Sequence, residues 1–361
     1  MATSSIYDRL SVILVTSPAP SNPSLILLQE VLSSFSHIPG LSSCRVIIMF
    51  DGYTLHAEAN TKAGRVTVEM AESYEEFFIN AQREFSVRGD QFVLIKSDRH
   101  LGFAMCVRNG LEMCTTEYAL IVQHDRCFMR RFSDMMNVIA CMDALPHIRY
   151  IGFPTVTSVN HENVMNTRYG LSELASSNQW IPISEEFMIK PLMFWYDSTH
   201  ICRISRYLEI YKPFTYMHST MKAIVGTKAI KSMIMKQGDF IEDRFGQAQR
   251  SVLASLKGRS EDAALCFMWF GSYLLSPRSV AVTTDLKNSV PQAKTIFVGH
   301  LRGRTFDPTM ESKWKAEAQC FTSNCDREVI ATTTTTVAPA ADEIEYELFS
   351  LGNMLDGKLN I

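Results

Sequence analysis

Residues 97–128 read SDRHLGFAMCVRNGLEMCTTEYALIVQHDRCF. We expect a helix over Leu101–Cys114, followed by a buried strand over the apolar run Tyr118–Val122. The strand ends on the triplet Gln123-His124-Asp125. This order predicts one carboxylate, Asp125, at the mouth of an α/β sheet, where charged ligands bind.

The chain before this stretch alternates between β-branched runs and helical patterns. Asn22 with Pro23 is expected to start one helix, and Ser73 with Glu76 resembles the capping box of another. Alternating strands and helices predict a parallel, doubly wound sheet with helices on both faces. The three further strands are expected over Val12–Val15, Arg45–Phe50 and Phe92–Ile95.

Polar residues follow these strands at the edge where such sheets bind ligands. Side chains two apart on a strand share a face, so Gln123 and Asp125 are expected to point together and His124 away. A carboxylate such as Asp125 can bind a hard divalent cation that also takes phosphate oxygens. The alternative is a helix cap, or a salt bridge with Arg126, Arg130 or Arg131. The residues at this edge are Thr16, Ser17, Pro18, Asp51, Asp98, Gln123, His124 and Asp125.

Composition excludes some classes of function. The 361 residues are 46% hydrophobic and 20% charged, with a formal net charge of -3, so no general attraction for nucleic acid is expected. The nine cysteines are scattered without a CxxC pair, which favours reduced thiols and a cytoplasmic protein. The longest apolar stretch, Cys266–Leu275, is too short for a membrane span.

One domain is expected over residues 1–320. The regular alternation ends near residue 130, but no linker divides the part over 1–130 from the part over 131–320, so both are expected to share one core. Five threonines, Thr332–Thr336, and an acidic segment follow. Residues 321–361 therefore predict a Thr-rich linker and an acidic tail.

The order of these motifs resembles that of glycosyltransferases with the GT-A fold, and most closely family 2. The matching features are the small-residue loop after the first strand, Asp51-Gly52, the helix Gly102…Arg108-Asn109-Gly110, and Gln123-His124-Asp125. The resemblance implies an α/β fold of the GT-A (Rossmann-like) type: a mixed, mostly parallel sheet flanked by helices on both faces. It also implies transfer of one sugar from a nucleoside diphosphate sugar, UDP-linked by expectation, to a hydroxyl of a glycan, protein or small-molecule acceptor.

The resemblance assigns the donor side of the site. Asp51 would hydrogen-bond the base or ribose, Asp98 would lie beside the base, and Arg108 belongs to the motif of the donor half. Asp125 would bind the Mn²⁺ or Mg²⁺ ion that bridges the diphosphate. Gln123 departs from the family, because it replaces the first aspartate of the family's triplet and removes one negative charge from the cation site.

The acids in the segment Phe240–Phe245 resemble the family's Glu-Asp motif. In that motif a carboxylate removes the proton of the acceptor hydroxyl, as an inverting displacement requires. Asp243 is the expected base, and Glu242 is the second choice. The alternative is an acid-rich first turn of a helix.

A histidine near the end of the domain completes the donor side. His300 follows a short strand and precedes Arg302 and Arg304 on a Gly-containing loop. Such a histidine can be a neutral metal ligand, and the arginines can bind the departing diphosphate. The alternative is a structural histidine.

The acceptor side is less defined. Asp197 lies in a segment that resembles the acceptor side of the family, and Trp195 and Trp269 could stack on sugar rings or belong to the core. Two other functions remain open. A sugar nucleotidyltransferase usually has Gly and Lys in the first loop, which residues 16–20 lack, and Gln123 is consistent with a catalytically inactive nucleotide- or sugar-binding protein.

Overall fold

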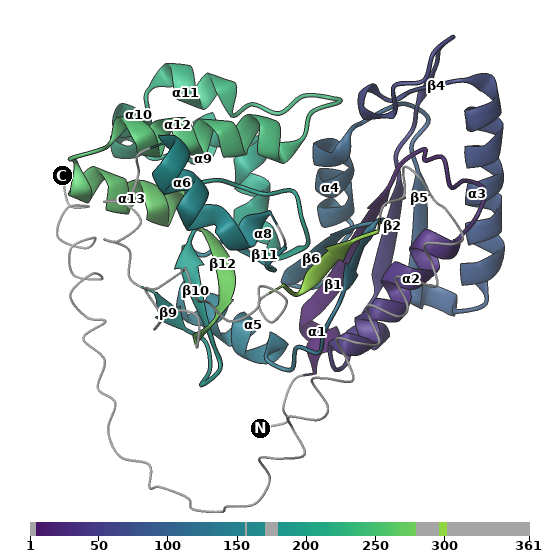
Figure 1. The fold of residues 1–361 in the computed structure, drawn as a ribbon, viewed down its shortest axis with the longest axis horizontal. Coiled ribbons are helices and arrows are strands. Elements are labelled where there is room, and N and C mark those ends of the chain that lie inside the picture. Colours follow the sequence, from purple (N-terminus) through teal and green to yellow (C-terminus); the bar gives the residue numbers. More distant parts are fainter. Residues whose placement is uncertain (1–4, 156, 170–179, 279–295, 302–361) are drawn as a thin grey trace, which may run out of the picture. The chain divides into compact units, whose positions relative to one another are not determined.

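A nine-stranded sheet runs through the computed structural model, which describes residues 5–155, 157–169, 180–278 and 296–301 (Figure 1). Its order is β5-β2-β1-β6-β11-β8-β12-β10-β9. Seven of the nine strands run in one direction, and β11 and β10 are the exceptions. The strands of this sheet are β1 Leu10–Thr16, β2 Val46–Phe50, β5 Phe92–Lys96, β6 Tyr118–Gln123, β8 Tyr150–Gly152, β9 Ile181–Pro182, β10 Phe187–Pro191, β11 His200–Arg203 and β12 Ser272–Pro277.

Two small ladders accompany the sheet. β3 (Thr54–Leu55) pairs with β4 (Arg65–Val66), and β7 (Arg126–Phe128) pairs with β13 (Val298–His300). The helices are α1 Ile6–Arg9, α2 Ile26–Ser34, α3 Val68–Ser86, α4 Phe103–Glu112, α5 Met135–Ala144, α6 His161–Tyr169, α8 Ile204–Leu208, α9 Pro213–Tyr216, α10 Ser219–Val225, α11 Thr227–Ser232, α12 Gln247–Ser255 and α13 Ser260–Phe270.

Strand β1 shows how one sheet holds two cores. Every residue of β1 is buried, as expected of a strand covered on both faces. Val12 and Leu14 point to the core that α2, α3 and α5 cover, and Ile13 and Val15 point to the core that α4, α12 and α13 cover. The predicted α/β fold, with a mostly parallel mixed sheet and helices on both faces, is confirmed.

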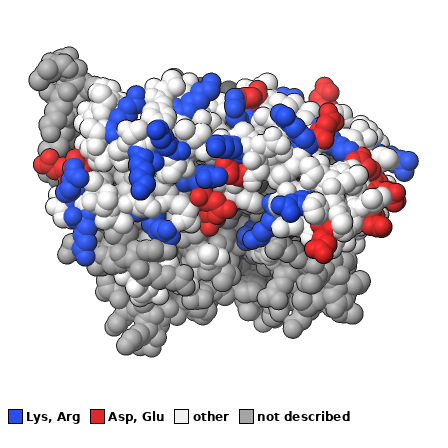
Figure 2. Space-filling model, turned by 90° about the horizontal axis from the view of Figure 1, so that it is seen from above, with Lys and Arg blue, Asp and Glu red and all other residues white. Residues whose placement is uncertain are grey.

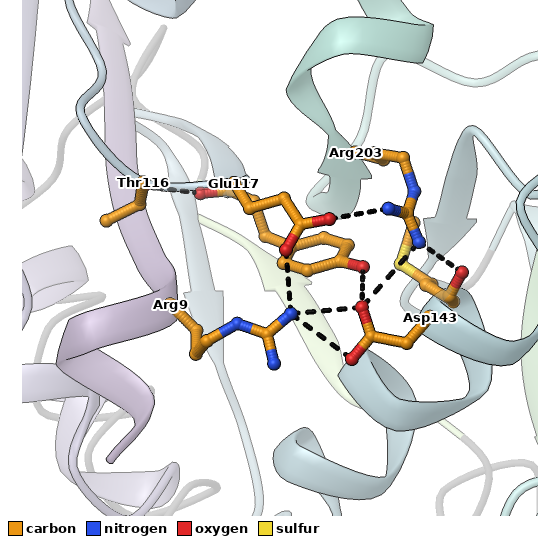
Figure 3. A network of polar contacts seen from close by, with 7 residues as sticks. Arg9, Thr116, Glu117, Asp143 and Arg203 are labelled. Atoms are coloured by element: carbon orange, nitrogen blue, oxygen red, sulfur yellow. Dashed lines mark hydrogen bonds and ion pairs between the residues drawn. The ribbon is translucent and has the colours of Figure 1, made fainter. Parts of the chain in front are cut away.

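A network of charges closes the amino-terminal end of β6 (Figure 3). Arg9 donates to Glu117 at 2.8 Å and to Asp143 at 3.0 Å, and Arg203 donates to Glu117 at 2.6 Å. The hydroxyl of Tyr118 donates to Asp143 at 2.6 Å. These contacts join α1, β6, α5 and β11 at the end of the sheet away from the carboxyl ends of the strands.

Two predicted helix starts are wrong. Helix α3 begins earlier, where Thr67 accepts a hydrogen bond at its N-terminus, and Ser73 lies inside the helix with its hydroxyl donating to a backbone carbonyl. Helix α2 begins at Ile26, because Asn22 instead uses its side-chain oxygen to accept the N–H of Ala19 at 2.8 Å. Short polar side chains bond to whichever nearby backbone group is free, so they favour turns as much as caps.

The predicted linker and tail, residues 321–361, lie outside the described residues. Arg302 and Arg304 also lie outside them. No described helix is long and apolar enough to cross a membrane. The seven cysteines among the described residues are free thiols.

Candidate functional site

A pocket lies at the carboxyl ends of β1, β2 and β6. Strand β6 stops at Gln123, and the next two residues form a turn, so all three residues of the triplet line the pocket. The expected alternation of His124 away from Asp125 is therefore wrong, because the extended backbone that it requires has ended. The pocket is lined by Val15, Ser17, Pro18, Ala19, Pro20, Asp51, Thr61, Lys62, His100, Gly102, Phe103, Gln123, His124, Asp125 and Phe240. It thus brings together six of the predicted donor-side residues.

Asp51 lines the pocket but is nearly fully buried, with 3% of its surface exposed. Its carboxylate accepts the backbone N–H groups of Leu101 at 2.6 Å and Gly102 at 3.0 Å. Its own N–H donates to the carbonyl of Thr16 at 2.8 Å. Thr16 is itself buried and does not line the pocket, so its contribution here is to hold the backbone of Asp51. Asp51 therefore fixes the loop before α4, in addition to any contact that it makes with a ligand.

His100 joins this loop to Asp51. Its Nδ1 atom lies 2.9 Å from Oδ2 of Asp51. The contact with Asp51 raises the pKa of His100, although burial acts in the opposite direction. The sequence offered no motif around His100 beyond its place directly before Leu101-Gly102.

A backbone clasp holds the loop against the second half of the chain. Gly238 donates its N–H to the carbonyl of Leu101 at 2.7 Å. Gly102 has a φ of 77°, and a Cβ atom there would lie 2.6 Å from the Cα of Gly238. Only glycine suits both the conformation and the close approach. Beside the clasp, the rings of Phe103 and Phe240 stack with centroids 6.1 Å apart and form an apolar wall of the pocket.

Asp125, which lines the pocket, contacts His300. The antiparallel pairing of β7 and β13 sets His300 opposite Arg126, and the N–H of Leu301 donates to the carbonyl of Asp125 at 2.7 Å. Nε2 of His300 lies 3.0 Å from Oδ2 of Asp125. Burial alone would raise the pKa of Asp125, but the bond to His300 and the charges of its neighbours outweigh burial and lower it.

This pair fits part of a metal site. Oδ1 of Asp125 is buried and accepts no hydrogen bond from the described residues. A carboxylate and an imidazole are a suitable start for Mn²⁺, and phosphate oxygens and water would complete the coordination. Within the described ranges, no cluster of three or more His, Cys, Asp and Glu side chains could hold a metal ion. Any ion there would therefore depend on oxygens from its ligand.

Gln123 uses its amide to hold a distant segment. Its Nε2 atom donates to the backbone carbonyl of Asp197 at 2.7 Å. A carboxylate at this position could not donate that hydrogen bond. The residue that departs from the family's triplet thus joins the end of β6 to the second half of the chain.

Asp197 and Glu242 hold each other through two reciprocal bonds. The N–H of Asp197 donates to Oε2 of Glu242 at 3.3 Å, and the N–H of Glu242 donates to Oδ1 of Asp197 at 3.1 Å. Burial, and then the charge of Glu242, raise the pKa of Asp197 well above its ordinary range. Burial also raises the pKa of Glu242, and the charge of Asp243 adds to this. Two close carboxyl groups of this kind favour a state in which one is neutral.

The charge of Arg126 acts on both acidic groups. Its Nε atom is 4.0 Å from Oδ1 of Asp125, and its charge also acts on Glu242. Burial lowers the pKa of Arg126, and its Nε–H donates a hydrogen bond to no acceptor among the described residues. A sparsely hydrated arginine at this place can bind phosphate oxygens. The sequence suggested it only as a possible salt-bridge partner of Asp125.

Other predicted residues lie outside the pocket lining, and these include Asp197, Glu242 and His300. Asp243 is exposed at the first turn of the π-helical segment Glu242–Gly246, next to the partly buried Glu242. Asp98 is exposed in the turn after β5. Arg108 pairs with Glu112 on α4, with Nε 3.0 Å from the carboxylate. None of Asp98, Arg108 and Asp243 lines the pocket.

The two tryptophans predicted on the acceptor side belong to the core. Trp195 has no exposed surface and packs against Tyr150, Tyr207 and Phe245. Trp269 is 9% exposed and packs against Phe270. A ring enclosed by other side chains has no free face for a sugar, so this prediction is corrected.

Comparisons with known proteins give only loose likenesses. No protein-family model and no curated protein sequence match the chain. Among solved structures, TarS 1–349 from S. aureus in complex with UDP-GlcNAc has 13% identity and a TM-score of 0.32, over 57% of this chain and 47% of that one. The mannosyltransferase PcManGT from Pyrobaculum calidifontis, with GDP-Man and Mn²⁺, has 10% identity and a TM-score of 0.34, over 72% and 73%.

GalNAc-T7 with UDP, GalNAc and Mn²⁺ has 7% identity and a TM-score of 0.35, over 57% of this chain and 37% of that one. The matched regions thus span about half or less of TarS 1–349 and GalNAc-T7.

Proposed function

We propose that this chain is a glycosyltransferase that moves one sugar from a nucleoside diphosphate sugar to a hydroxyl acceptor, with inversion at the anomeric carbon. One observation supports this most. Arg126 lies within electrostatic range of both Asp125, which contacts His300, and Glu242, a carboxylate whose pKa is raised. Arg126 is suited to bind an anionic leaving group, and Glu242, on which its charge acts, is suited to act as a base.

The donor would lie along the carboxyl ends of β1, β2 and β6. The stacked rings of Phe103 and Phe240 offer a flat apolar wall for a nucleobase. The diphosphate would lie toward Asp125 and His300, which would hold Mn²⁺ or Mg²⁺, and toward Arg126. A divalent ion bound there would offset the charge that grows on the diphosphate as it leaves.

Glu242, rather than Asp243, is the proposed base. A base must approach the acceptor hydroxyl, and its pKa must lie near enough to the working pH to accept a proton. Glu242 removes that proton, the hydroxyl oxygen forms a bond to the anomeric carbon, and the electron pair of the broken bond leaves with the diphosphate. The exposed Asp243 has no contact that would orient it for this task among the described residues.

Asp197 is proposed to orient this base, in place of the direct acceptor contact that its segment suggested. Its side chain accepts the N–H of Glu242, and its own N–H donates to the carboxylate of Glu242. The amide of Gln123 fixes the backbone of Asp197 from the donor side. A neutral Asp197 would leave the negative charge on Glu242, where proton transfer needs it.

Glu242→Gln and Asp243→Asn form a matched pair for the test. Each variant replaces a carboxylate with its amide, one residue apart. We expect Glu242→Gln to reduce transfer by about a hundredfold or more, which is the usual contribution of a general base, and Asp243→Asn to change it little. Stabilisation of each variant by UDP with Mn²⁺, measured by thermal shift, reports donor-product binding separately.

The assay begins with release of UDP from common UDP-sugars without an acceptor. Metal-stimulated release that disappears in Asp125→Ala supports the enzyme. Stabilisation by nucleoside diphosphates without turnover of any donor would instead support a catalytically inactive binding protein. One observation favours that alternative: both carboxylate oxygens of Asp51 already accept hydrogen bonds, from the N–H groups of Leu101 and Gly102. Equal transfer by Glu242→Gln and the wild type would refute Glu242 as the base.

A further inference from the structure

One segment of the chain carries a concentration of positive charge. From Ile210 to Gly238 the sequence contains no aspartate and no glutamate, although the whole chain has a net charge of -3. The same segment contains no arginine. Its five lysines are Lys212, Lys222, Lys228, Lys231 and Lys236.

These lysines, called the lysine surface below, are available to a partner. Lys222 is partly exposed and the other four are exposed. Among the residues that the structure describes, none of the five forms an ion pair within 4.0 Å. Their charges are therefore not neutralised by a neighbouring carboxylate in direct contact.

Exposed apolar side chains lie between the lysines along the chain. Phe214 is 39% exposed, Tyr216 is 51% exposed and Ile234 is 36% exposed. Each lies within four residues of Lys212, Lys231 or Lys236. Single exposed apolar residues are ordinary, but three of the larger ones in one acid-free segment make that segment amphipathic.

The figures place this segment on one side of the molecule. Helices α10 and α11, which carry Lys222, Lys228 and Lys231, lie together above the second half of the sheet (Figure 1). Seen from above, that side carries more blue lysine and arginine than red acid, whereas the opposite side, toward α3, carries most of the red (Figure 2). The basic charge is thus gathered on one side of this face.

We propose that the lysine surface binds an anionic lipid bilayer. Lysines near an anionic membrane each add to binding, and Phe, Tyr and Ile side chains beside them can enter the interfacial layer. This mode of binding needs no spanning helix. It also does not depend on the proposed sugar transfer, since none of these residues lines the pocket.

The residue types favour a bilayer over a nucleic acid. Arginine, with its planar fork, is the residue of choice for phosphate and nucleic-acid recognition, and it is absent from Ile210–Gly238. A polyanion would use only the lysines, whereas a bilayer uses the lysines and the exposed apolar groups. The contribution of Tyr216 therefore separates the two partners.

The position of the segment gives the binding a consequence. It runs directly into Gly238, which is bonded to Leu101, and then into Phe240 of the pocket wall. A bilayer held at the lysine surface would therefore lie near the pocket and could present a membrane-borne substrate to it.

The test is binding of the full chain to vesicles, measured by co-sedimentation. The vesicles contain either phosphatidylcholine alone or equal parts of phosphatidylcholine and phosphatidylglycerol. We expect binding to the anionic vesicles only, with loss at high salt. Lys228→Gln with Lys231→Gln should weaken the partition coefficient about 25-fold, since each lysine near an anionic surface contributes roughly fivefold.

Arg65→Gln with Arg83→Gln is the matched control. It removes the same charge from exposed positions near α3, and it should leave binding within about twofold. Tyr216→Ser should weaken binding severalfold at constant charge. Thermal unfolding of each variant shows that the fold is retained.

Three results would overturn the proposal. The first is absence of binding to anionic vesicles at low salt. The second is equal loss of binding in the lysine and arginine pairs. The third is binding to a polyanion such as heparin that exceeds vesicle binding and does not respond to Tyr216→Ser.

Discussion

Gln123→Glu tests the bond that joins the two halves of the site. The substitution keeps the size of the side chain but replaces an N–H donor, 2.7 Å from the carbonyl of Asp197, with an oxygen. The hydrogen bond, worth about 1 kcal/mol, is lost, and a buried carbonyl that faces a carboxylate loses a further ~1–3 kcal/mol. We therefore expect a loss of about 2–4 kcal/mol in the free energy of unfolding, or a fall in Tm of roughly 4–8 °C.

The assay is urea unfolding of wild type and variant at several pH values. A protonated carboxyl group can donate again, so the introduced group should have a raised pKa in the folded state. Its contribution to stability is then present below its unfolded pKa and is lost as pH rises. The deficit of the variant should accordingly be large at neutral pH and shrink toward about pH 4, near the ordinary pKa of a glutamate.

Gln237→Glu is a matched control for this prediction. Gln237 also donates its side-chain amide to a backbone carbonyl, that of His100 at 2.5 Å, but on the exposed surface. Water can replace an exposed bond, so the control should lose less than about 0.5 kcal/mol. If the two variants lose the same stability, or if the deficit of Gln123→Glu does not depend on pH, then the tether between Gln123 and Asp197 is refuted.

Two further predictions concern the loop before α4. Gly102→Ala should lose about 2–4 kcal/mol in the free energy of urea unfolding and most of the stabilisation by UDP, because Gly102 has a positive φ and its added Cβ atom would collide with Gly238. The control is Gly258→Ala. Gly258 has a φ of 79° and no atom within 4 Å of an added Cβ, so this variant should lose only about 1 kcal/mol. Equal losses of stability in Gly102→Ala and Gly258→Ala would show that the close approach of Gly102 to Gly238 does not constrain position 102. His100→Gln should change the pH dependence of stability. Contact with Asp51 raises the pKa of His100 in the folded protein. The contribution of this contact to stability is therefore complete below the unfolded histidine pKa of about 6.5, and it is lost as pH rises through the higher folded value. His37 gives the opposite sign, because burial lowers its pKa, and a His37→Gln variant that showed the same trend as His100→Gln would contradict the assignment.

The strands could be predicted well because their signal is local. Each of the four expected strands corresponds to an observed one, β1, β2, β5 and β6, within two residues at either end. A continuous apolar run between turn residues has few other stable states in a sheet that is covered on both faces. From those strands, the meeting of Asp51 with the Gln123–Asp125 triplet followed, since parallel strands place their carboxyl ends on one edge.

The helix starts and the tryptophans could not be predicted for a different reason. A short polar side chain such as Asn22 can cap a helix or close a turn, and the sequence does not say which backbone group is free. The residues next to Trp195 along the chain are the same whether its ring faces a sugar or the core, so they do not distinguish the two. Its burial depends on Tyr150 and Phe245, which are 45 and 50 residues away along the chain.

The choice between Glu242 and Asp243 shows where sequence reasoning stops. Adjacent residues on a helix point in directions about 100° apart, so only one of two neighbouring acids can face a site. Glu242, and not Asp243, is held here by Asp197, which lies 45 residues earlier: the backbone N–H of each of these two residues donates to the carboxylate of the other. A motif of two acids contains no information about that partner.

The same tertiary contact explains why an amide at position 123 suits this site. Asp125 directly follows β6, Gln123 bonds to Asp197, and Asp197 bonds to Glu242, so three carboxyl groups already belong to this region. The pKa of Asp197 is raised by burial and by Glu242. A carboxylate at position 123 would add a further negative charge and would face the carbonyl of Asp197 without a proton to donate. An amide at position 123 therefore avoids this repulsion and adds a bond, and it leaves Asp125 as the triplet's one carboxylate, in contact with His300.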